Sequence, residues 1–316
     1  MIDSGSQNPG EGSRLPLFRH ALRCPDCHGP LTDAATTLRC GDCGRSYPVI
    51  QGRPLLMTEA CRLELNLHLE SDNGKRMIDE YAVPAAPPRR QGWRRALRLL
   101  RPPPVMYHLH PDLLQPPTSV LFEGDDPLRR LVLNLGGGPY RVSATEVTLN
   151  IGLFPGVDLM ADAHNIPLGD ETVDAIFSLA VLEHVTDPHQ VVREMMRVLK
   201  PGGILYSEVP FIFFFHGYPS DYTRFTREGI RRLFSGLENP EIAMTHGPVS
   251  AVLQSANMLL QLLMPERPAV LRKIVNGGFR WLVFPLKYMD LLLRDHPDAH
   301  ILAGGFYVLG RKPDKA

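Results

Sequence analysis

Four of the five cysteines stand in two closely spaced pairs, Cys24 with Cys27 and Cys40 with Cys43. Each pair has the form C-x2-C, and twelve residues separate the pairs. Two thiolates from one tight turn can occupy two corners of a tetrahedron and a second turn the other two, so this spacing predicts a zinc ribbon. Four thiolates leave no open coordination position, which predicts a structural zinc. The alternatives are free thiols or two disulfides, and a reducing cytosol disfavours disulfides. Cys61 lies outside the pattern and is expected to act as a small hydrophobic residue.

Three glycines, Gly136 to Gly138, follow the apolar run of residues 131–135. Glycine has no Cβ atom, so the backbone can turn sharply there and approach a ligand closely. A phosphate-binding loop is excluded, because no Gly-Lys-Ser/Thr follows. The G-x-G-x-x-G spacing of dinucleotide-binding proteins is also absent, since Pro139 and Tyr140 come next. By itself the pattern predicts a strand that ends in a tight turn.

A series of short strands and one clear helix must position these glycines. Apolar runs predict strands at residues 131–135, 146–151, 157–163, 174–182 and 202–211, with a closing strand at 302–312. Asp187 and Pro188 predict the start of a helix that continues to Leu199 and ends before Pro201-Gly202-Gly203. Strands that alternate with helices or short crossovers indicate the α/β class with a mostly parallel, doubly wound sheet. Such sheets bind ligands at the carboxyl ends of their strands.

Two segments of the chain resemble known families. Residues 21–57, with their paired knuckles and the ending YPVIQGRPLLM, resemble the small zinc-ribbon proteins that activate RNA and protein methyltransferases. Residues 130–235, with NLGGG, ADAHNIPLGDETVDAIFSLAVLEHVTDP and EMMRVLKPGGILYSEVPF, resemble class I S-adenosylmethionine-dependent methyltransferases of the type 11 group. The resemblance implies a Rossmann-like sheet of seven strands behind an N-terminal zinc ribbon. S-adenosylmethionine would lie across the carboxyl ends of the first four strands.

The resemblance also implies which residues contact the cofactor. They are Asn134, Gly136, Gly137, Gly138, Asn150, Asp162 and Ala163. Asp162 would receive the adenine amino group, with the Ala163 amide beside it. Asn134 and Asn150 stand where the family usually has acids. An amide offers one acceptor oxygen and no charge, so the ribose contacts are expected to be weaker than with carboxylates. A chain that keeps the fold and has lost activity, acting as a non-catalytic partner, is therefore an alternative.

The loops after the fourth and fifth strands carry the candidates for the chemistry. Methyl transfer is an in-line displacement that needs alignment, and a base only where the acceptor is protonated. His216 and His184 are the candidate general bases, and Tyr222 is expected near the accepting atom. The aromatic run 211–215 is expected to form an apolar acceptor pocket with these polar groups around it.

Charge favours a small-molecule acceptor. The 316 residues hold 34 lysines and arginines against 34 aspartates and glutamates, so no chain-wide cationic field attracts nucleic acid. Residues 131–212 contain ten acids and four basic residues. We therefore expect a small-molecule, sugar-containing or lipid-linked acceptor and no strong nucleic-acid binding. A ribosomal or transfer RNA methyltransferase that grips RNA through the ribbon and the six arginines of Arg89–Arg101 is the alternative.

The sequence divides into four predicted parts: a disordered tail at 1–18, the zinc ribbon at 19–60, a proline- and arginine-rich linker at 61–127 and the methyltransferase domain at 128–316. The N-terminus has no apolar signal core, and no run of 18 apolar residues occurs, so a cytoplasmic location is expected. Apolar segments at 250–264 and 268–293 are expected to pack on the domain, to cap the acceptor pocket or to make peripheral contact with a membrane.

Overall fold

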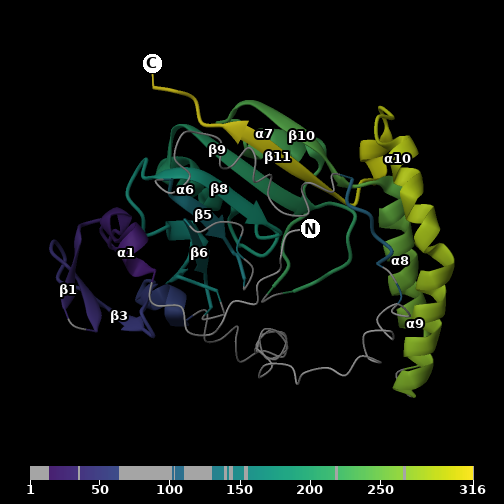
Figure 1. Ribbon diagram of the computed structural model, residues 1–316, viewed down its shortest axis with the longest axis horizontal. Coiled ribbons are helices and arrows are strands. Elements are labelled where there is room, and N and C mark those ends of the chain that lie inside the picture. Colours follow the sequence, from purple (N-terminus) through teal and green to yellow (C-terminus); the bar gives the residue numbers. More distant parts are fainter. Residues whose placement is uncertain are drawn as a thin grey trace.

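The computed structural model describes residues 14–34, 36–63, 102, 104–109, 130–138, 141, 145–152, 156–217, 220–265 and 268–315. Eleven strands form one sheet in the order β1-β2-β3-β4-β7-β6-β5-β8-β9-β11-β10 (Figure 1). The zinc-ribbon strands lie at one end of this sheet and the C-terminal helices near the other. Most of the predicted linker, with Arg89–Arg101, and residues 1–13 of the predicted tail lie outside the described residues.

The N-terminal unit is a small antiparallel sheet preceded by a helical turn. Its elements are α1 (Leu15–Phe18), η1 (Arg19–Ala21), β1 (Leu31–Ala34), β2 (Thr37–Cys40), β3 (Ser46–Ile50) and β4 (Arg53–Leu56). The sequence assigned residues up to 18 to the disordered tail, and for α1 this was wrong. Phe18 is fully buried in the main hydrophobic core, so the ordered unit begins before residue 19.

Seven further strands form the sheet that the family resemblance implies. They are β5 (Val132–Leu135), β6 (Glu146–Asn150), β7 (Leu159–Ala161), β8 (Val173–Leu179), β9 (Leu199–Pro210), β10 (Glu238–His246) and β11 (Gly305–Arg311). The five from β5 to β9 are mutually parallel, and β11 inserts antiparallel between β9 and β10. The predicted α/β class, the parallel core and the closing strand are confirmed.

The ribbon continues the sheet of the larger domain. Strand β4 pairs in parallel with β7, with Leu55 opposite Met160 and Leu56 opposite Ala161. Phe18 and Leu56 belong to the same buried apolar cluster as residues of β5, β6 and α6 (Pro188–Val198). The two predicted units therefore share one core, and the ribbon covers what would otherwise be the open edge at β7.

Side-chain hydrogen bonds fix the start of α6 and the connection between β5 and β6. Helix α6 begins as predicted, because the Asp187 side chain accepts a hydrogen bond from the Gln190 amide at 2.9 Å. In the connection between β5 and β6, the Arg141 guanidinium binds both carboxylate oxygens of Asp158 at 2.7 Å each. It also donates to the carbonyl of Gly156 at 2.6 Å, so it ties this connection to the one after β6.

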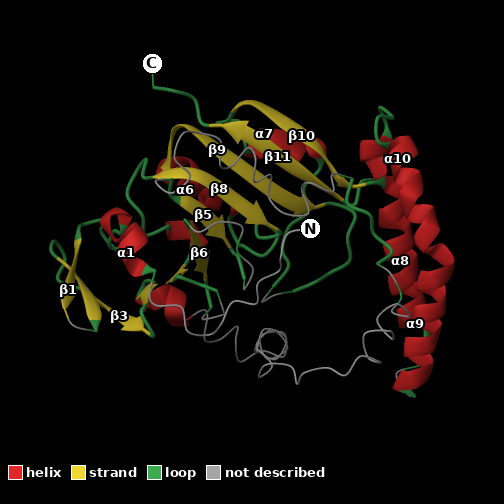
Figure 2. Cartoon of the chain, in the orientation of Figure 1, coloured by secondary structure: helices red, strands yellow, loops and turns green. Residues whose placement is uncertain are grey.

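Helical elements stand beside the far end of the sheet (Figure 2). Helices α8 (Pro248–Leu263) and α9 (Ala269–Val283) lie side by side, and η5 (Phe284–Met289), α10 (Asp290–Leu293) and η6 (Ala299–Leu302) follow. The buried Asp290 carboxylate accepts from the amides of Val249 at 2.8 Å and Ser250 at 3.0 Å and so caps α8. Among the described residues, no helix is long and apolar enough to cross a membrane. The remaining helix, α7 (Arg227–Leu233), precedes β10.

Candidate functional site

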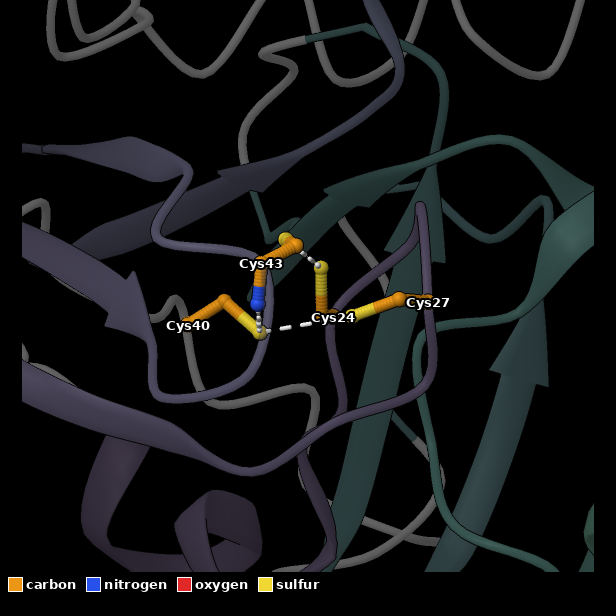
Figure 3. A group of neighbouring side chains, drawn as sticks. All are labelled: Cys24, Cys27, Cys40 and Cys43. Atoms are coloured by element: carbon orange, nitrogen blue, oxygen red, sulfur yellow. Dashed lines mark hydrogen bonds between the residues drawn. The ribbon is translucent and has the colours of Figure 1, made fainter.

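The four cysteines of the two knuckles meet at one point (Figure 3). The Cys24 and Cys43 sulfurs are 3.7 Å apart, and those of Cys27 and Cys40 are 3.4 Å apart. Four sulfurs at about 2.3 Å from a tetrahedral zinc ion would be about 3.8 Å from each other, so the arrangement fits one zinc. The buried Tyr47 hydroxyl lies 3.1 Å from the Cys24 sulfur, within hydrogen-bond reach of it.

The cysteine outside the knuckles packs with apolar residues as expected and also hydrogen-bonds the Asp162 carboxylate, which the sequence did not suggest. The half-buried Cys61 packs against the apolar cluster of Met57, Val157 and Met160, beside the join of ribbon and domain. It does not belong to the group of four sulfurs.

The glycine loop leaves the carboxyl end of β5 in a conformation that suits glycine. Gly136 has a φ of 75°, and its amide donates to the Leu149 carbonyl of β6 at 2.8 Å. A Cβ atom on Gly136 would lie 2.3 Å from Cγ2 of Val181. The loop therefore needs glycine there for its own turn and for contact with the segment after β8, whatever it binds. Gly138 is half-buried beside it.

Asn134 points beneath the glycine loop. Its side chain is buried and donates to the Glu146 carboxylate at 2.7 Å, and a Cβ atom on Gly137 would lie 2.2 Å from its amide nitrogen. Glu146 is itself fully buried and also accepts from the Thr148 hydroxyl at 3.1 Å. An acid at position 134 would face this carboxylate, so the pair explains why an amide stands there.

Asn150 braces the same loop from β6. Its side-chain nitrogen donates to the carbonyls of Gly136 at 3.1 Å and Gly137 at 2.9 Å, and its oxygen accepts from the Gly152 amide at 3.3 Å. A carboxylate could not donate these two bonds. The contact of Asn150 with ribose hydroxyls that the resemblance implies therefore stays a prediction.

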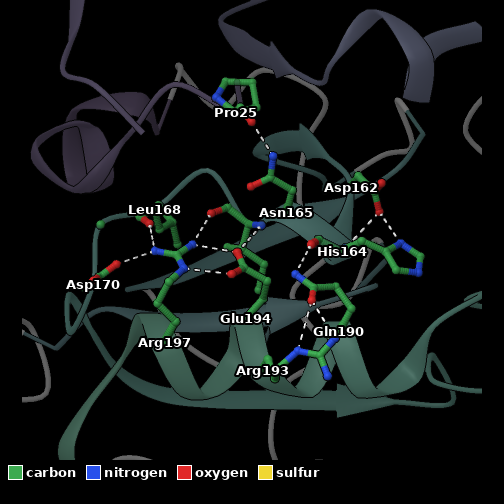
Figure 4. A network of polar contacts seen from close by, with 12 residues as sticks. Pro25, Asp162, His164, Asn165, Leu168, Asp170, Gln190, Arg193, Glu194 and Arg197 are labelled. Carbon is green, nitrogen blue, oxygen red and sulfur yellow. Dashed lines mark hydrogen bonds and ion pairs between the residues drawn. The ribbon is translucent and has the colours of Figure 1, made fainter. Parts of the chain in front are cut away.

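Asp162 lies at the end of β7, where it caps the short η4 (Ala163–Asn165) (Figure 4). Its carboxylate accepts from the backbone amide of His164 at 2.9 Å and lies 2.7 Å from Nδ1 of the His164 ring. Burial acts to raise the pKa of Asp162, but the His164 hydrogen bonds outweigh it and hold the pKa below its usual value. Asp162 is thus a charged acceptor at the predicted adenine position.

Sequence reasoning missed the role of His164, which joins Asp162 to the start of α6. Its Nε2 accepts from the Asp187 amide at 3.1 Å, and its carbonyl accepts from the Gln190 side chain at 3.1 Å. Nε2 accepts from a backbone amide, so the ring proton resides on Nδ1 and points at Asp162. The sequence AHN gives no periodic signal for such a role.

A second network ties this segment to the ribbon (Figure 4). The Asn165 side chain donates to the carbonyl of Pro25, inside the first cysteine knuckle. Glu194 and Arg197 of α6 hold the other side of the segment: Glu194 accepts from the Ile166 amide at 2.9 Å, and Arg197 donates to the Ile166 carbonyl at 2.7 Å. The predicted adenine segment is therefore fixed between the zinc knuckle and α6.

The structure brings the two predicted histidines together. The His184 and His216 rings meet edge to face with centroids 4.9 Å apart. The fully buried Glu183 carboxylate lies between them, with Oε1 3.4 Å from Nε2 of His216 and 3.7 Å from Nε2 of His184. Glu183 raises the pKa of His216 above its ordinary value, against the opposing effect of burial.

The aromatic segment frames this cluster. The stacked rings of Phe213 and Phe214 both contact the His216 ring edge to face. The buried Asp221 carboxylate accepts from the His216 amide at 2.9 Å and from Arg224, which fixes the loop. The Tyr222 amide donates a hydrogen bond to the Glu183 carbonyl at 2.7 Å. The Tyr222 ring is exposed, and its role near the accepting atom stays a prediction.

An apolar groove includes Ile212, the residue that precedes Phe213 in the sequence. It is lined by Ile212, Ala251, Val252, Ser255, Ala256, Leu259 and Leu302 and encloses about 290 Å³. Five of the lining residues belong to α8, and the apolar side chains of two of these, Val252 and Leu259, are exposed.

Comparison with known proteins identifies two segments. Residues 143–207 match the family described as Methyltransferase domain, and residues 17–52 match the family described as Trm112p-like protein. An uncharacterized methyltransferase of Mycobacterium bovis is 31% identical over 100 residues, which cover 26% of this chain and 39% of that protein. An uncharacterized 37.1 kDa protein of Streptomyces fradiae is 27% identical over 169 residues, 49% of this chain and 46% of that protein. The chain spans less than half the length of these curated relatives.

Solved structures give more distant similarities. The complex between the Haloferax volcanii Trm112 methyltransferase activator and a putative methyltransferase is 19% identical, with a TM-score of 0.36, over 58% of this chain and 82% of that chain. A Haemonchus contortus phosphoethanolamine N-methyltransferase 2 is 15% identical, with a TM-score of 0.41, over 83% of this chain and 62% of that chain. With the family matches, the strand order and the four clustered sulfurs, the chain combines a class I methyltransferase domain with a Trm112p-like zinc ribbon.

Proposed function

We propose that this chain transfers a methyl group from S-adenosylmethionine to a small or lipid-linked acceptor that has an apolar part. The apolar groove lined by Ile212 and by residues of α8 is the observation that supports an acceptor with an apolar part. The match to the methyltransferase domain supports the reaction.

The carboxyl edge of the sheet fits the cofactor in part. Gly136 is exposed at the carboxyl end of β5, and Asp162 supplies a charged acceptor whose orientation His164 fixes. Asn150 is committed to the glycine loop, so the ribose contact must come with a rearrangement or from other groups. When bound, S-adenosylmethionine supplies an electrophilic methyl group. The protein's part is then to hold the acceptor in line with it, which the loops after β8 and β9 are placed to do.

The reacting atom of the acceptor would lie at Glu183, His184 and His216, with the apolar part against the aromatic segment. The polar cluster and the apolar groove are adjacent in the loop after β9, because His216 and Ile212 are four residues apart. A ligand with one polar and one apolar end satisfies both surfaces, since each buries a group of its own kind.

The exposed C-terminal helices support a lipid-linked acceptor. Large apolar side chains are exposed on them: Leu259, Leu262, Leu263, Val270, Ile274, Trp281, Leu282 and Leu292. Arg272 and Lys273 lie on α9 among these apolar positions. Such a surface can rest on the headgroup region of a bilayer and present the groove to a lipid.

Incubation with S-adenosylmethionine labelled in its methyl group tests the proposal. A cellular extract divided into lipid, water-soluble metabolite and RNA fractions serves as the source of acceptor. We expect label in the lipid or metabolite fraction, and its loss in Ala256→Arg, which blocks the groove. Ala269→Arg adds the same charge at an exposed position of α9 and should keep activity.

Label in RNA that is lost in the Arg94→Glu, Arg95→Glu variant would promote the RNA alternative. Calorimetry with S-adenosylhomocysteine distinguishes an enzyme, with either kind of acceptor, from a non-catalytic partner. A partner protein that has lost the cofactor site would bind no S-adenosylhomocysteine.

A further inference from the structure

Three donor groups face a single point beside the predicted methyl acceptor. Glu183 and His184 follow β8, and His216 follows β9. One carboxylate oxygen and one nitrogen from each ring all lie within 4.8 Å of one another. Among the described residues, this group and the four cysteines are the two that bring three or more such donors together. The four cysteines are explained by zinc in the ribbon, and the second group is the one left to explain.

In their neutral form both imidazoles present an unprotonated nitrogen to that point. Nδ1 of His184 lies 2.6 Å from the Ser220 carbonyl, which can only accept, so Nδ1 carries the proton and Nε2 a lone pair. Nδ1 of His216 lies 3.2 Å from the Phe214 carbonyl and 3.4 Å from the Asp221 carboxylate, which assigns the same tautomer. A histidine that donates one ring nitrogen to a carbonyl or carboxylate while the other faces inward is the usual pattern around a bound metal.

Among the described residues, the central carboxylate has no hydrogen bond, and its ion-pair partners are the two imidazoles. Glu183 is fully buried, and neither of its oxygens has a hydrogen-bond partner among the described residues. A buried carboxylate without compensation is unfavourable, so a positive charge should lie beside it. A proton shared with His216 would draw the two atoms to about 2.7–2.9 Å, the length of a charge-assisted hydrogen bond. The separation is 3.4 Å, which leaves room for an ion.

We propose that Glu183, His184 and His216 bind one divalent transition-metal ion. Donor atoms at about 2.1 Å from a metal are about 3.0–3.6 Å apart for bond angles between 90° and 120°. The carboxylate lies 3.4 and 3.7 Å from the two nitrogens, close to that range. Two imidazoles and one carboxylate suit manganese, iron or zinc and leave coordination positions open.

The cluster can be reached from solvent through its two histidines. The side chains of His184 and His216 are 14% and 20% exposed, while Glu183 is 0% exposed. Where the proposed function holds, the metal would bind an acceptor oxygen and lower its pKa, so that the base role expected of His216 passes to the ion. Metal binding itself does not rest on that function.

Manganese binding to the full, zinc-loaded chain tests the proposal without any methyl transfer. Free Mn²⁺ gives an electron paramagnetic resonance signal that disappears on binding, and Mn²⁺ has little affinity for the four thiolates. We expect one Mn²⁺ per chain, and binding at least about tenfold weaker in Glu183→Gln, His184→Gln and His216→Gln. His189→Gln and Glu238→Gln are the matched controls, because both residues are exposed and neither belongs to the cluster, and each should bind as the parent does.

The melting temperature with and without Mn²⁺ provides a second measurement, which also shows whether each variant is folded. Mn²⁺ should raise the melting temperature of the parent and of both controls, and it should leave that of Glu183→Gln unchanged. A parent that binds neither Mn²⁺ nor a second Zn²⁺ per chain would overturn the proposal, and so would binding that survives in Glu183→Gln. Binding of the metal by a chain that transfers no methyl group would refute the proposed function and leave this site standing.

Discussion

The side chain of Asn165 donates a hydrogen bond to the carbonyl of Pro25, across 140 residues of sequence. Pro25 lies between two cysteines of the first knuckle, and Asn165 ends the short helical turn that Asp162 caps. Two backbone bonds run alongside: Arg23 donates to the Pro167 carbonyl at 3.0 Å, and Gly169 donates to Ala21 at 2.7 Å. The zinc knuckle and the predicted adenine segment therefore form one continuous structure.

Asn165→Ala should weaken the join between the two units. Loss of this hydrogen bond is expected to lower the free energy of unfolding by about 1–3 kcal/mol, because Pro25 is buried and its carbonyl would lose the Asn165 donor. Urea denaturation followed by circular dichroism measures the change. Glu238→Ala is the control, since Glu238 is exposed at the opposite edge of the sheet. Equal stability of parent and Asn165→Ala would show that the contact adds nothing.

Removal of a zinc ligand should affect more than the ribbon. Cys40→Ser is expected to lower the zinc content by one ion per chain and to lower the melting temperature of the whole chain in one transition. The reason is that Cys40 and Leu38 belong to the same buried cluster as Leu133 of the larger domain. Metal analysis and calorimetry check both parts. Cys61→Ser should keep the zinc, because Cys61 lies outside the group of four sulfurs.

The parts of the fold that follow from local pattern were predictable. Apolar runs marked each parallel strand, Asp187 and Pro188 marked the start of α6, and the cysteine spacing marked the ribbon. The join of β4 to β7 was not predictable, because two short strands from distant segments pair through backbone groups that leave no signature in sequence.

The sequence indicated which loops carry the candidate residues and was less informative about what each side chain contacts. His184 and His216 do lie together, as the loops after β8 and β9 require. Asn134 and Asn150 were expected to face the cofactor, whereas their side chains donate hydrogen bonds to Glu146 and to the glycine loop. Side-chain direction at the end of a strand depends on neighbours from other segments, which a single sequence does not show.

Asp162→Ala should weaken cofactor binding. Loss of a hydrogen bond to a charged group costs about 1.5–3 kcal/mol, which is a rise of about 10- to 150-fold in the Kd for S-adenosylhomocysteine. Isothermal titration calorimetry measures the Kd, and the melting temperature shows whether the variant is folded. Asp295→Ala, which changes an exposed acid near the C-terminal helices, should bind as the parent does. An unchanged Kd in Asp162→Ala would place the cofactor elsewhere.

Gly136→Ala should destabilise the glycine loop even without cofactor. The new Cβ would lie 2.3 Å from Val181, and a φ of 75° is strained for alanine, so we expect a loss of at least about 1–3 kcal/mol in the free energy of unfolding. Adding Val181→Ala removes the overlap and should restore part of the loss, while the strain in φ remains. Gly278→Ala, in α9 with open space around it, should be neutral or stabilising. A double variant no more stable than Gly136→Ala would contradict the contact.

The stability of the chain should fall with acid in a way that depends on His246. Burial, with a smaller effect of the nearby His108, lowers the pKa of His246 to about 3 in the folded protein. In the unfolded chain its pKa is about 6.5, so the folded state binds fewer protons below that pH. The contribution of His246 is fully present above about pH 6.5 and is lost as the pH falls toward 3. By pH 5 we expect a loss of about 1–2 kcal/mol relative to pH 7.

His246→Gln should remove that part of the pH dependence. Its backbone bonds remain available, because the His246 carbonyl accepts from the Gly304 amide at 2.8 Å through main-chain atoms. Denaturant titrations at pH 7 and pH 5 give the free energy of unfolding of parent and variant. The difference between the two pH values should be smaller in His246→Gln than in the parent, and His189→Gln, an exposed histidine, should match the parent. Parallel curves for parent and His246→Gln would show that His246 charges as easily in the folded chain as in the unfolded one.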